Sequence, residues 1–91
     1  MITESCGNVF LDLGFPPDEA EILAMRSNLM GQLRLMIDER GLTQQEAAKL
    51  LGVKQSRISD LVRGKFERFS LDMLISFAIR AGMRVEMHLA A

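Results

Sequence analysis

The sequence has one cysteine, one histidine and neither tryptophan nor tyrosine among its 91 residues. A single cysteine excludes an internal disulfide and a multi-cysteine metal site, and we expect Cys6 to have no functional role. The lone His88 has no obvious partner ligands, so we do not expect it to bind a metal. The sequence therefore predicts neither a metal nor another cofactor.

Long apolar runs and catalytic motifs are also missing. No stretch approaches the roughly 20 apolar residues of a membrane-spanning helix, and "MITESCGNVF" lacks the basic and then apolar order of a signal peptide. We therefore expect a cytoplasmic protein. There is no serine elbow, phosphate-binding glycine loop or H-E-x-x-H motif, and the cysteine and histidine lie at opposite ends, so we expect no enzymatic activity.

The length and the composition are those of one small globular domain, residues 1–91. Apolar residues make up 48% of the chain and charged residues 25%, as in an ordinary folded protein. A chain of this size buries a limited core by itself, and a second subunit would extend that core. We therefore expect a homodimer.

Charge is divided unevenly along the chain, although the total is only −1. Residues 1–39 carry two arginines against seven carboxylates, a net charge of −5, whereas residues 40–68 carry seven basic against three acidic residues, a net charge of +4. Such asymmetry indicates a polyanion bound by the basic part. Solvated helix faces would explain the same charges, and composition alone does not decide between the two.

The first helical region covers residues 18–41, where apolar residues recur at spacings of three and four. Pro17 suits a first turn and Gly41 suits the end of a helix. The region can form one long helix, or two joined near Ser27 or Gly31. One helix is our preferred interpretation.

A second, shorter helix begins after Thr43, because Thr43 and Glu46 form the T-x-x-E pattern of a capping box. Gly52 can adopt the positive φ that ends this helix and turns the chain. A third helix is predicted from about Lys54 to Arg63. Two short helices joined by such a turn form a helix-turn-helix, which can place its second helix in the DNA major groove.

Apolar and small residues occur where this geometry needs them. Ala48 is small where the two helices cross, Val53 fills the turn, and Ile58 and Leu61 anchor the outer helix to the core. An αα-hairpin without a function would share one or two of these features. All of them together favour a DNA-binding shape.

The spacing of apolar residues changes from helical to alternating near the C-terminus. Ser70 caps a last helix over residues 70–81, and residues 83–89 then alternate apolar and polar side chains, which predicts a strand. The strand needs a partner, either "NVFLDL" in the same chain or, as we prefer, its own copy across a two-fold axis. The predicted organisation is an N-terminal extension (1–17), a first helical region (18–41), a helix-turn-helix (43–63), a last helix (70–81) and a C-terminal strand (83–89). The fold class is an all-α bundle of four to five helices.

The stretches "LTQQEAAKLLGVKQSRISDLVRGK" and "FSLDML" resemble the DNA-binding unit of Cro/C1 (XRE)-type regulators, over roughly residues 29–81. This resemblance implies a lambda repressor-like fold and binding to double-stranded DNA. With "NVFLDLGF" before it and "GMRVEMHL" after it, the chain is most similar to small HigA-like antitoxins. These bind DNA and also neutralise an RNA-cleaving toxin encoded beside them.

The resemblance also implies which residues contact DNA. Gln44 would touch a phosphate and brace Gln55, which would read adenine through its N6 and N7 edge. Arg57 would contact guanine or a phosphate, and both roles stay open. Lys54 lies at the cap position of the third helix although lysine caps poorly, which indicates unpaired amides available to a phosphate. The predicted DNA-contacting residues are Gln44, Lys54, Gln55, Ser56, Arg57, Ser59, Arg63 and Lys65.

Three further residues have structural interpretations. Asp60 would repel phosphate, so we expect it to form an ion pair within the helix with Arg57 and Arg63 rather than to read cytosine. Phe66 and Phe69 follow the third helix, and we expect them to fill the core rather than to stack on bases.

The function predicted first is a dimeric repressor that binds an inverted-repeat operator and serves as the antitoxin of a toxin-antitoxin pair. In this interpretation the basic part holds DNA and the acidic N-terminal region holds a small basic toxin with RNase activity. A second interpretation is a stand-alone XRE-type regulator with no toxin. A third, of a different class, is a protein-interaction adaptor that does not bind DNA.

Overall fold

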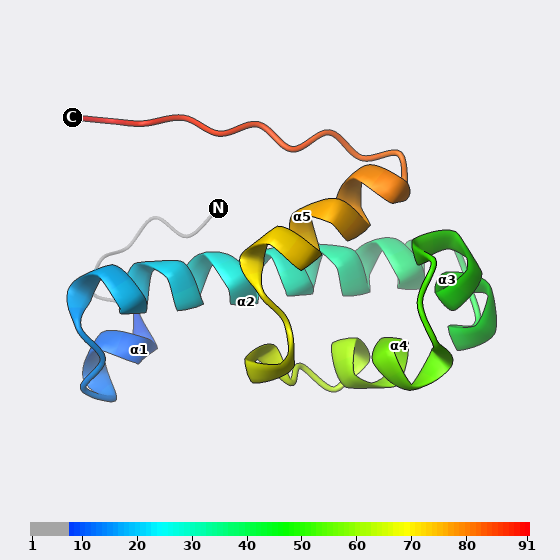
Figure 1. Cartoon of the computed structure of the whole chain (residues 1–91), viewed down its shortest axis with the longest axis horizontal. Coiled ribbons are helices and arrows are strands. Elements are labelled where there is room, and N and C mark those ends of the chain that lie inside the picture. The colour runs from blue at the N-terminus through cyan, green and yellow to red at the C-terminus, as the bar shows by residue number, and fades with distance from the viewer. Residues whose placement is uncertain (1–7) are drawn as a thin grey trace.

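The computed structural model describes residues 8–91, and within this range the chain forms a bundle of helices with no β-strand (Figure 1). In chain order the elements are α1 (Val9–Asp12), α2 (Pro17–Glu39), α3 (Gln44–Leu51), α4 (Gln55–Val62), the 3₁₀ turn η2 (Phe66–Arg68) and α5 (Leu71–Arg80). The predicted all-α class is confirmed.

The long helix α2 is the axis on which the other elements pack. It runs without a break for 23 residues, so the alternative of two helices joined near Ser27 or Gly31 is wrong. Pro17 suits its first turn because the first amides of a helix have no partner within the helix. In Figure 1, α5 crosses one side of α2 and α4 lies on the other, while α3 closes the carboxyl end.

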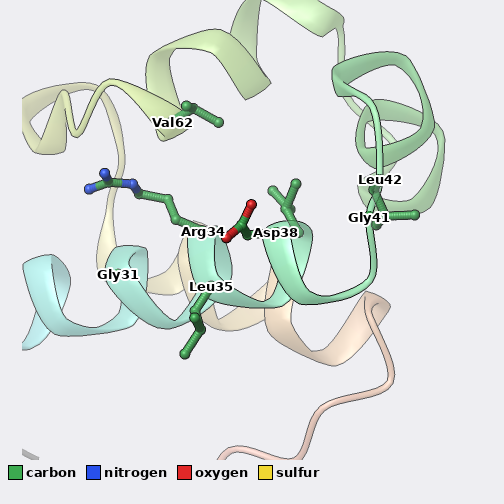
Figure 2. Close-up of a pocket in the computed structure, with 8 residues that line it drawn as sticks. Gly31, Arg34, Leu35, Asp38, Gly41, Leu42 and Val62 are labelled. Carbon is green, nitrogen blue, oxygen red and sulfur yellow. The ribbon is translucent and has the colours of Figure 1, made fainter.

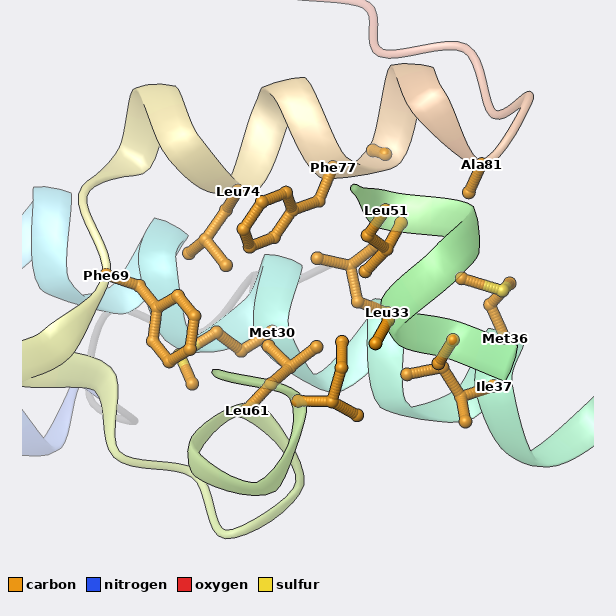
Figure 3. Close-up of a cluster of buried hydrophobic side chains, with 14 residues drawn as sticks. Met30, Leu33, Met36, Ile37, Leu51, Leu61, Phe69, Leu74, Phe77 and Ala81 are labelled. Carbon is orange, nitrogen blue, oxygen red and sulfur yellow. The ribbon is translucent and has the colours of Figure 1, made fainter. Parts of the chain in front are cut away.

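One apolar core joins four helices and the segment after α4 (Figure 3). Leu33 of α2, Leu51 of α3, Leu61 of α4 and Leu74 of α5 are each 0% exposed. Phe69, which follows η2, is 2% exposed and packs its ring edge-to-face with that of Phe77. Because α3 and α4 share this core with α2 and α5, the geometry of the helix-turn-helix is set by the whole bundle.

The segment "NVFLDL" forms the helix α1, and its proposed pairing with the C-terminal strand is therefore wrong. The side chain of Asn8 caps α1 by accepting a hydrogen bond from the amide of Phe10 at 3.0 Å, and its Nδ2 donates to the carbonyl of Ala20 at 3.4 Å. Phe10 is buried against Ala20 and Ala24. These contacts favour a helical turn because they satisfy polar groups and bury an aromatic ring together.

The strand predicted at residues 83–89 is not formed within the chain. The amide of Met83 donates to the carbonyl of Ala78 at 2.9 Å, and among the described residues no backbone hydrogen bond follows it. Met87 and Leu89 are 75% and 97% exposed. In Figure 1 this segment runs beside the bundle as an unpaired tail. Pairing with a second copy stays a prediction.

Candidate nucleic-acid interface

The helix α4 turns one side to the core and the other to solvent. Ile58 and Leu61 are each 0% exposed, whereas Gln55 and Ser56 are exposed. Successive residues of a helix are turned by about 100°, so the buried pair defines one side and Ser56 and Ser59 lie on the opposite side. The third helix of the sequence analysis is thus a short rod held through two apolar residues.

The supporting helix α3 has both of its ends satisfied by the chain itself. The hydroxyl of Thr43 accepts from the amide of Glu46 at 3.1 Å, and the carboxylate of Glu46 accepts from the amide of Thr43 at 2.8 Å, which confirms the predicted capping box. Gly52 ends the helix with a φ of +70°. The guanidinium of Arg80 donates to the carbonyl of Leu51 at 2.6 Å, a contact that the sequence did not predict.

The first turn of α4 is different, because no side chain caps it. Lys54 occupies the cap position in an extended conformation, as predicted, and its side chain makes no capping hydrogen bond. Its carbonyl accepts from the amides of Arg57 and Ile58 at 2.9 and 3.4 Å. Within residues 8–91, the amides of Gln55 and Ser56 have no protein acceptor. A helix start with open amides and partial positive charge is suited to an anion.

None of the residues predicted to contact DNA is buried. Gln44 comes from the first turn of α3. The others belong to α4 and its two ends: Lys54, Gln55, Ser56, Arg57, Ser59, Arg63 and Lys65. No hydrogen bond joins Gln44 to Gln55 in the described part of the chain, so the structure does not form the predicted brace.

Asp60 does not pair with Arg57 and Arg63, and this prediction was wrong. Its carboxylate lies 3.8 Å from Nζ of Lys65 and 3.9 Å from Nη1 of Arg68. The reason is the turn at the end of α4, which reverses the chain and brings Lys65 and Arg68 alongside the helix. Sequence spacing within the helix could not reveal partners that lie beyond its end.

The turn η2 is held to both α2 and α4 by arginines. Arg57 donates to the carbonyl of Arg68 at 3.2 Å and lies 5.5 Å above the ring centre of Phe69. From α2, Arg26 donates to the carbonyl of Phe66 at 3.5 Å. Phe69 is buried and Phe66 is partly buried against the core, which confirms the expectation that these rings fill the interior. Arg57 therefore has a partner in the protein before any ligand is bound.

On the other side of α4, an open cavity of about 500 Å³ separates its carboxyl end from α2 (Figure 2). Val62 lies above this cavity, and Arg34 and Asp38 extend from α2 into it. The Nη1 atom of Arg34 lies 3.7 Å from the position that a Cβ would take at Gly64. Arg34 thus joins the basic residues next to Gly64, although the sequence analysis counted it with the acidic first region. Arg34 and Gly64 are far apart in the sequence, so no local pattern predicted that they lie close together.

The remaining chemistry of the described residues is limited. Residues 8–91 contain no cluster of three His, Cys, Asp or Glu side chains able to hold a metal ion. His88 is exposed, and its Nε2 lies 3.7 Å from the carboxylate of Glu86. Cys6 lies outside the described residues. None of the helices described is long and apolar enough to cross a membrane.

Comparison with known proteins adds one finding. A protein-family model described as "Helix-turn-helix domain" matches residues 9–90, which is nearly the whole chain. A comparison with curated proteins finds no match.

Proposed function

The chain belongs to the helix-turn-helix domain family, and from this premise we propose that it is a sequence-specific, DNA-binding transcriptional repressor. The observation that carries the proposal is the presentation of α4. Ile58 and Leu61 hold it to the core, its polar side is exposed, and its first amides are open. An exposed polar side is common to surface helices, so the feature that points to an anionic ligand is the uncapped start of α4.

In this proposal α4 enters the major groove with its N-terminal end first. Gln55 reads adenine by a bidentate hydrogen bond, and Ser56 and Ser59 contact neighbouring bases or phosphates. The open amides and Lys54 bind a phosphate at the start of the helix. Arg63 and Lys65 meet the backbone at its other end.

Recognition of an inverted-repeat operator follows if the protein is a homodimer. Two copies of α4 would then lie about 34 Å apart, one turn of the duplex. The tail at residues 83–89 supports this arrangement, because it alternates apolar and polar residues and leaves its backbone unpaired in the single chain. Pairing of two such tails would satisfy the backbone groups along one edge of each tail and would cover part of Met87 and Leu89.

We further propose that the protein is an antitoxin that represses its own operon and neutralises a small basic toxin with RNase activity. The support is the surface of α1 and the first half of α2. Asp18, Glu19 and Glu21 are exposed there, next to the exposed apolar side chains of Ile22 and Met25. An acidic and partly apolar surface remote from α4 suits a basic protein partner. The protein would act in the cytoplasm, without catalytic activity and without a cofactor.

Two other functions make different predictions. A stand-alone regulator would bind DNA in the same way but would have no toxin encoded beside it. An adaptor would bind a protein partner and show no salt-sensitive affinity for duplex DNA. The open start of α4 favours the two DNA-binding functions over the adaptor.

The DNA-binding proposal is tested with duplexes from the protein's own promoter and random duplexes of equal length, compared by fluorescence anisotropy over a range of salt. We expect the promoter duplex to bind more tightly, and binding to weaken steeply with salt because Lys and Arg contacts release counterions. Equal affinity for both duplexes at moderate salt would remove the repressor proposal.

Single substitutions can distinguish residues that recognise a base from residues that contact the phosphate backbone. Gln55→Ala should lose about 1–3 kcal/mol of discrimination at one base pair, whereas Arg63→Ala should weaken binding to all sequences alike. Gln32→Ala is the matched control, since Gln32 lies on the side of α2 that faces Met83. It should change neither property.

The antitoxin and dimer proposals need separate tests. Co-expression with the neighbouring reading frame should yield a complex, and that frame should be toxic only when expressed alone. The absence of such a frame would leave the stand-alone regulator. Light scattering on a chain truncated after Gly82 should show a monomer if the tail makes the dimer, and a dimer in the truncated chain would contradict that role.

A further inference from the structure

Asp60 is the only carboxylate in α4, and it lies among cations. We propose that Asp60 is a specificity-determining residue that restrains Lys65 and Arg68, lowers affinity for arbitrary DNA and so favours one docking position. This inference deepens the proposed function and rests on it.

The placement of Asp60 is the first argument. Its side chain is 19% exposed and lies 3.8 Å from Lys65 and 3.9 Å from Arg68, whose side chains are 36% and 56% exposed. Asp60 and Arg68 also line an open groove of about 520 Å³, together with Lys54 and Arg57 from the first half of α4. Without Asp60 this groove would carry positive charge alone.

Folding does not account for this carboxylate. Ion pairs at these separations, with partners this exposed, contribute little to stability. The turn after α4 is held by other bonds, because the amide of Lys65 donates to the backbone carbonyl of Asp60 at 3.1 Å and Arg57 donates to the carbonyl of Arg68. The carboxylate side chain is therefore dispensable for the turn, while it opposes the approach of phosphate.

The effect on specificity comes from restraint. Free lysine and arginine side chains are flexible and can follow phosphates in many docking positions of a protein on DNA. A cation held by Asp60 keeps one position. It can therefore contact a phosphate only in a complex that places a phosphate at that position, and it adds little affinity to other complexes. Ordering before binding lowers the entropic cost of the matching complex alone. Asp60 also neutralises part of the charge that attracts any duplex.

The experiment compares Asp60→Asn with the wild-type chain on a random-sequence duplex, with anisotropy measured at several salt concentrations. We expect Asp60→Asn to bind about fivefold more tightly, the scale of one charge pair about 4 Å apart and fully screened by water. The slope of log affinity against log salt should become steeper by about 0.9, equivalent to one more phosphate contact. Enrichment of a preferred sequence from a randomised duplex pool should fall.

Two variants make the result specific. Glu67→Gln removes the same charge from an exposed neighbouring residue that forms no ion pair among the described residues, and it should leave the slope and enrichment near the wild-type values. Asp60→Glu keeps the charge and should retain low affinity for random DNA. Circular dichroism and thermal unfolding verify that each variant is folded.

The possible outcomes separate the two proposals. Equal gains for Asp60→Asn and Glu67→Gln would show an effect of net charge alone and overturn the inference, as would unchanged or weaker binding by a folded Asp60→Asn. If the wild-type chain and all variants bound no duplex, the DNA-binding function itself would fail. A gain confined to Asp60→Asn, with reduced enrichment, supports the inference.

Discussion

The two short helices α3 and α4 have the same length, eight residues, and differ in how their ends are satisfied. The start of α3 is capped by Thr43 and Glu46, and its end is closed by Gly52 and Arg80. The start of α4 has Lys54 at the cap position and no side-chain acceptor. The hydrogen-bonding groups at the two ends of α3 are thus satisfied within the protein, whereas the first amides of α4 remain open to a ligand.

The helices also differ in how much of each is buried. Ala47, Ala48 and Leu51 of α3 are buried, while Ile58 and Leu61 are the buried residues of α4. Ile58 and Leu61 are consequently the main apolar anchors of α4 in the shared core. Substitutions at the core and at the helix ends can therefore test whether α3 is the support and α4 the presented element.

The largest effect is expected for Ile58→Ala. Removing this fully buried side chain should lower the free energy of unfolding by about 3 kcal/mol, through lost burial and the cavity left behind. Urea unfolding followed by circular dichroism measures it. Ser56→Ala, on the exposed side of the same helix, should stay within about 0.5 kcal/mol of the wild type. A small loss for Ile58→Ala would mean that α4 is not anchored by the core.

A smaller effect is expected for Arg80→Met. The side chain keeps much of its apolar length but loses the charged hydrogen bond to the carbonyl of Leu51, so we expect a loss of about 2 kcal/mol. Arg84→Met is the control, because Arg84 is exposed and pairs only with Glu86 among the described residues. Similar losses in both variants would remove Arg80 as a support of α3.

Gly52→Ala should cost about 1–2 kcal/mol, because a Cβ is disfavoured in the left-handed conformation. The added atom would also lie 3.3 Å from Nη1 of Arg80. Gly31→Ala is the opposite case. Gly31 lies inside α2 with no atom within 4 Å of a new Cβ, so alanine there should stabilise by about 0.5–1 kcal/mol. Thermal unfolding of both variants should move in opposite directions.

Effects of about 1 kcal/mol are expected for substitutions at the cap residues of the two helices. Thr43→Ala should destabilise by about 1 kcal/mol because α3 loses its cap. Lys54→Ser should stabilise by a similar amount, about 1 kcal/mol, because serine can cap α4. The same substitution should weaken binding to promoter DNA, since it removes a cation and occupies an amide. A Lys54→Ser variant with lower stability or tighter DNA binding would contradict the difference between the two helices.

Much of the helix-turn-helix could be predicted because its signals are local. The hydroxyl of Thr43 and the carboxylate of Glu46 reach amides within one turn, and Gly52 adopts its conformation without help from distant residues. Ile58 and Leu61 share a side by helical spacing alone. These features require only the geometry of a single turn.

Other features could not be predicted because their partners are distant in sequence. The helix α1 is four residues long, too short to be stable alone, and depends on contacts of Asn8 and Phe10 with α2. Asp60 was assigned partners inside its own helix, whereas the reversal after α4 supplied Lys65 and Arg68. The alternation at residues 83–89 predicted a strand, but a strand also needs a neighbour, and the single chain has none there.

By itself, the sequence determined approximately where α2, α3, α4 and α5 begin and end, which sides of them are apolar, and which polar residues α4 carries. Each of these is set by interactions within one or two helical turns. Only the tertiary structure decided that Arg80 closes α3, that Arg34 reaches the turn at Gly64, and that Asp60 holds the cations after α4. Those contacts form because packing around a shared core brings together side chains from separate segments, and no local spacing encodes that proximity.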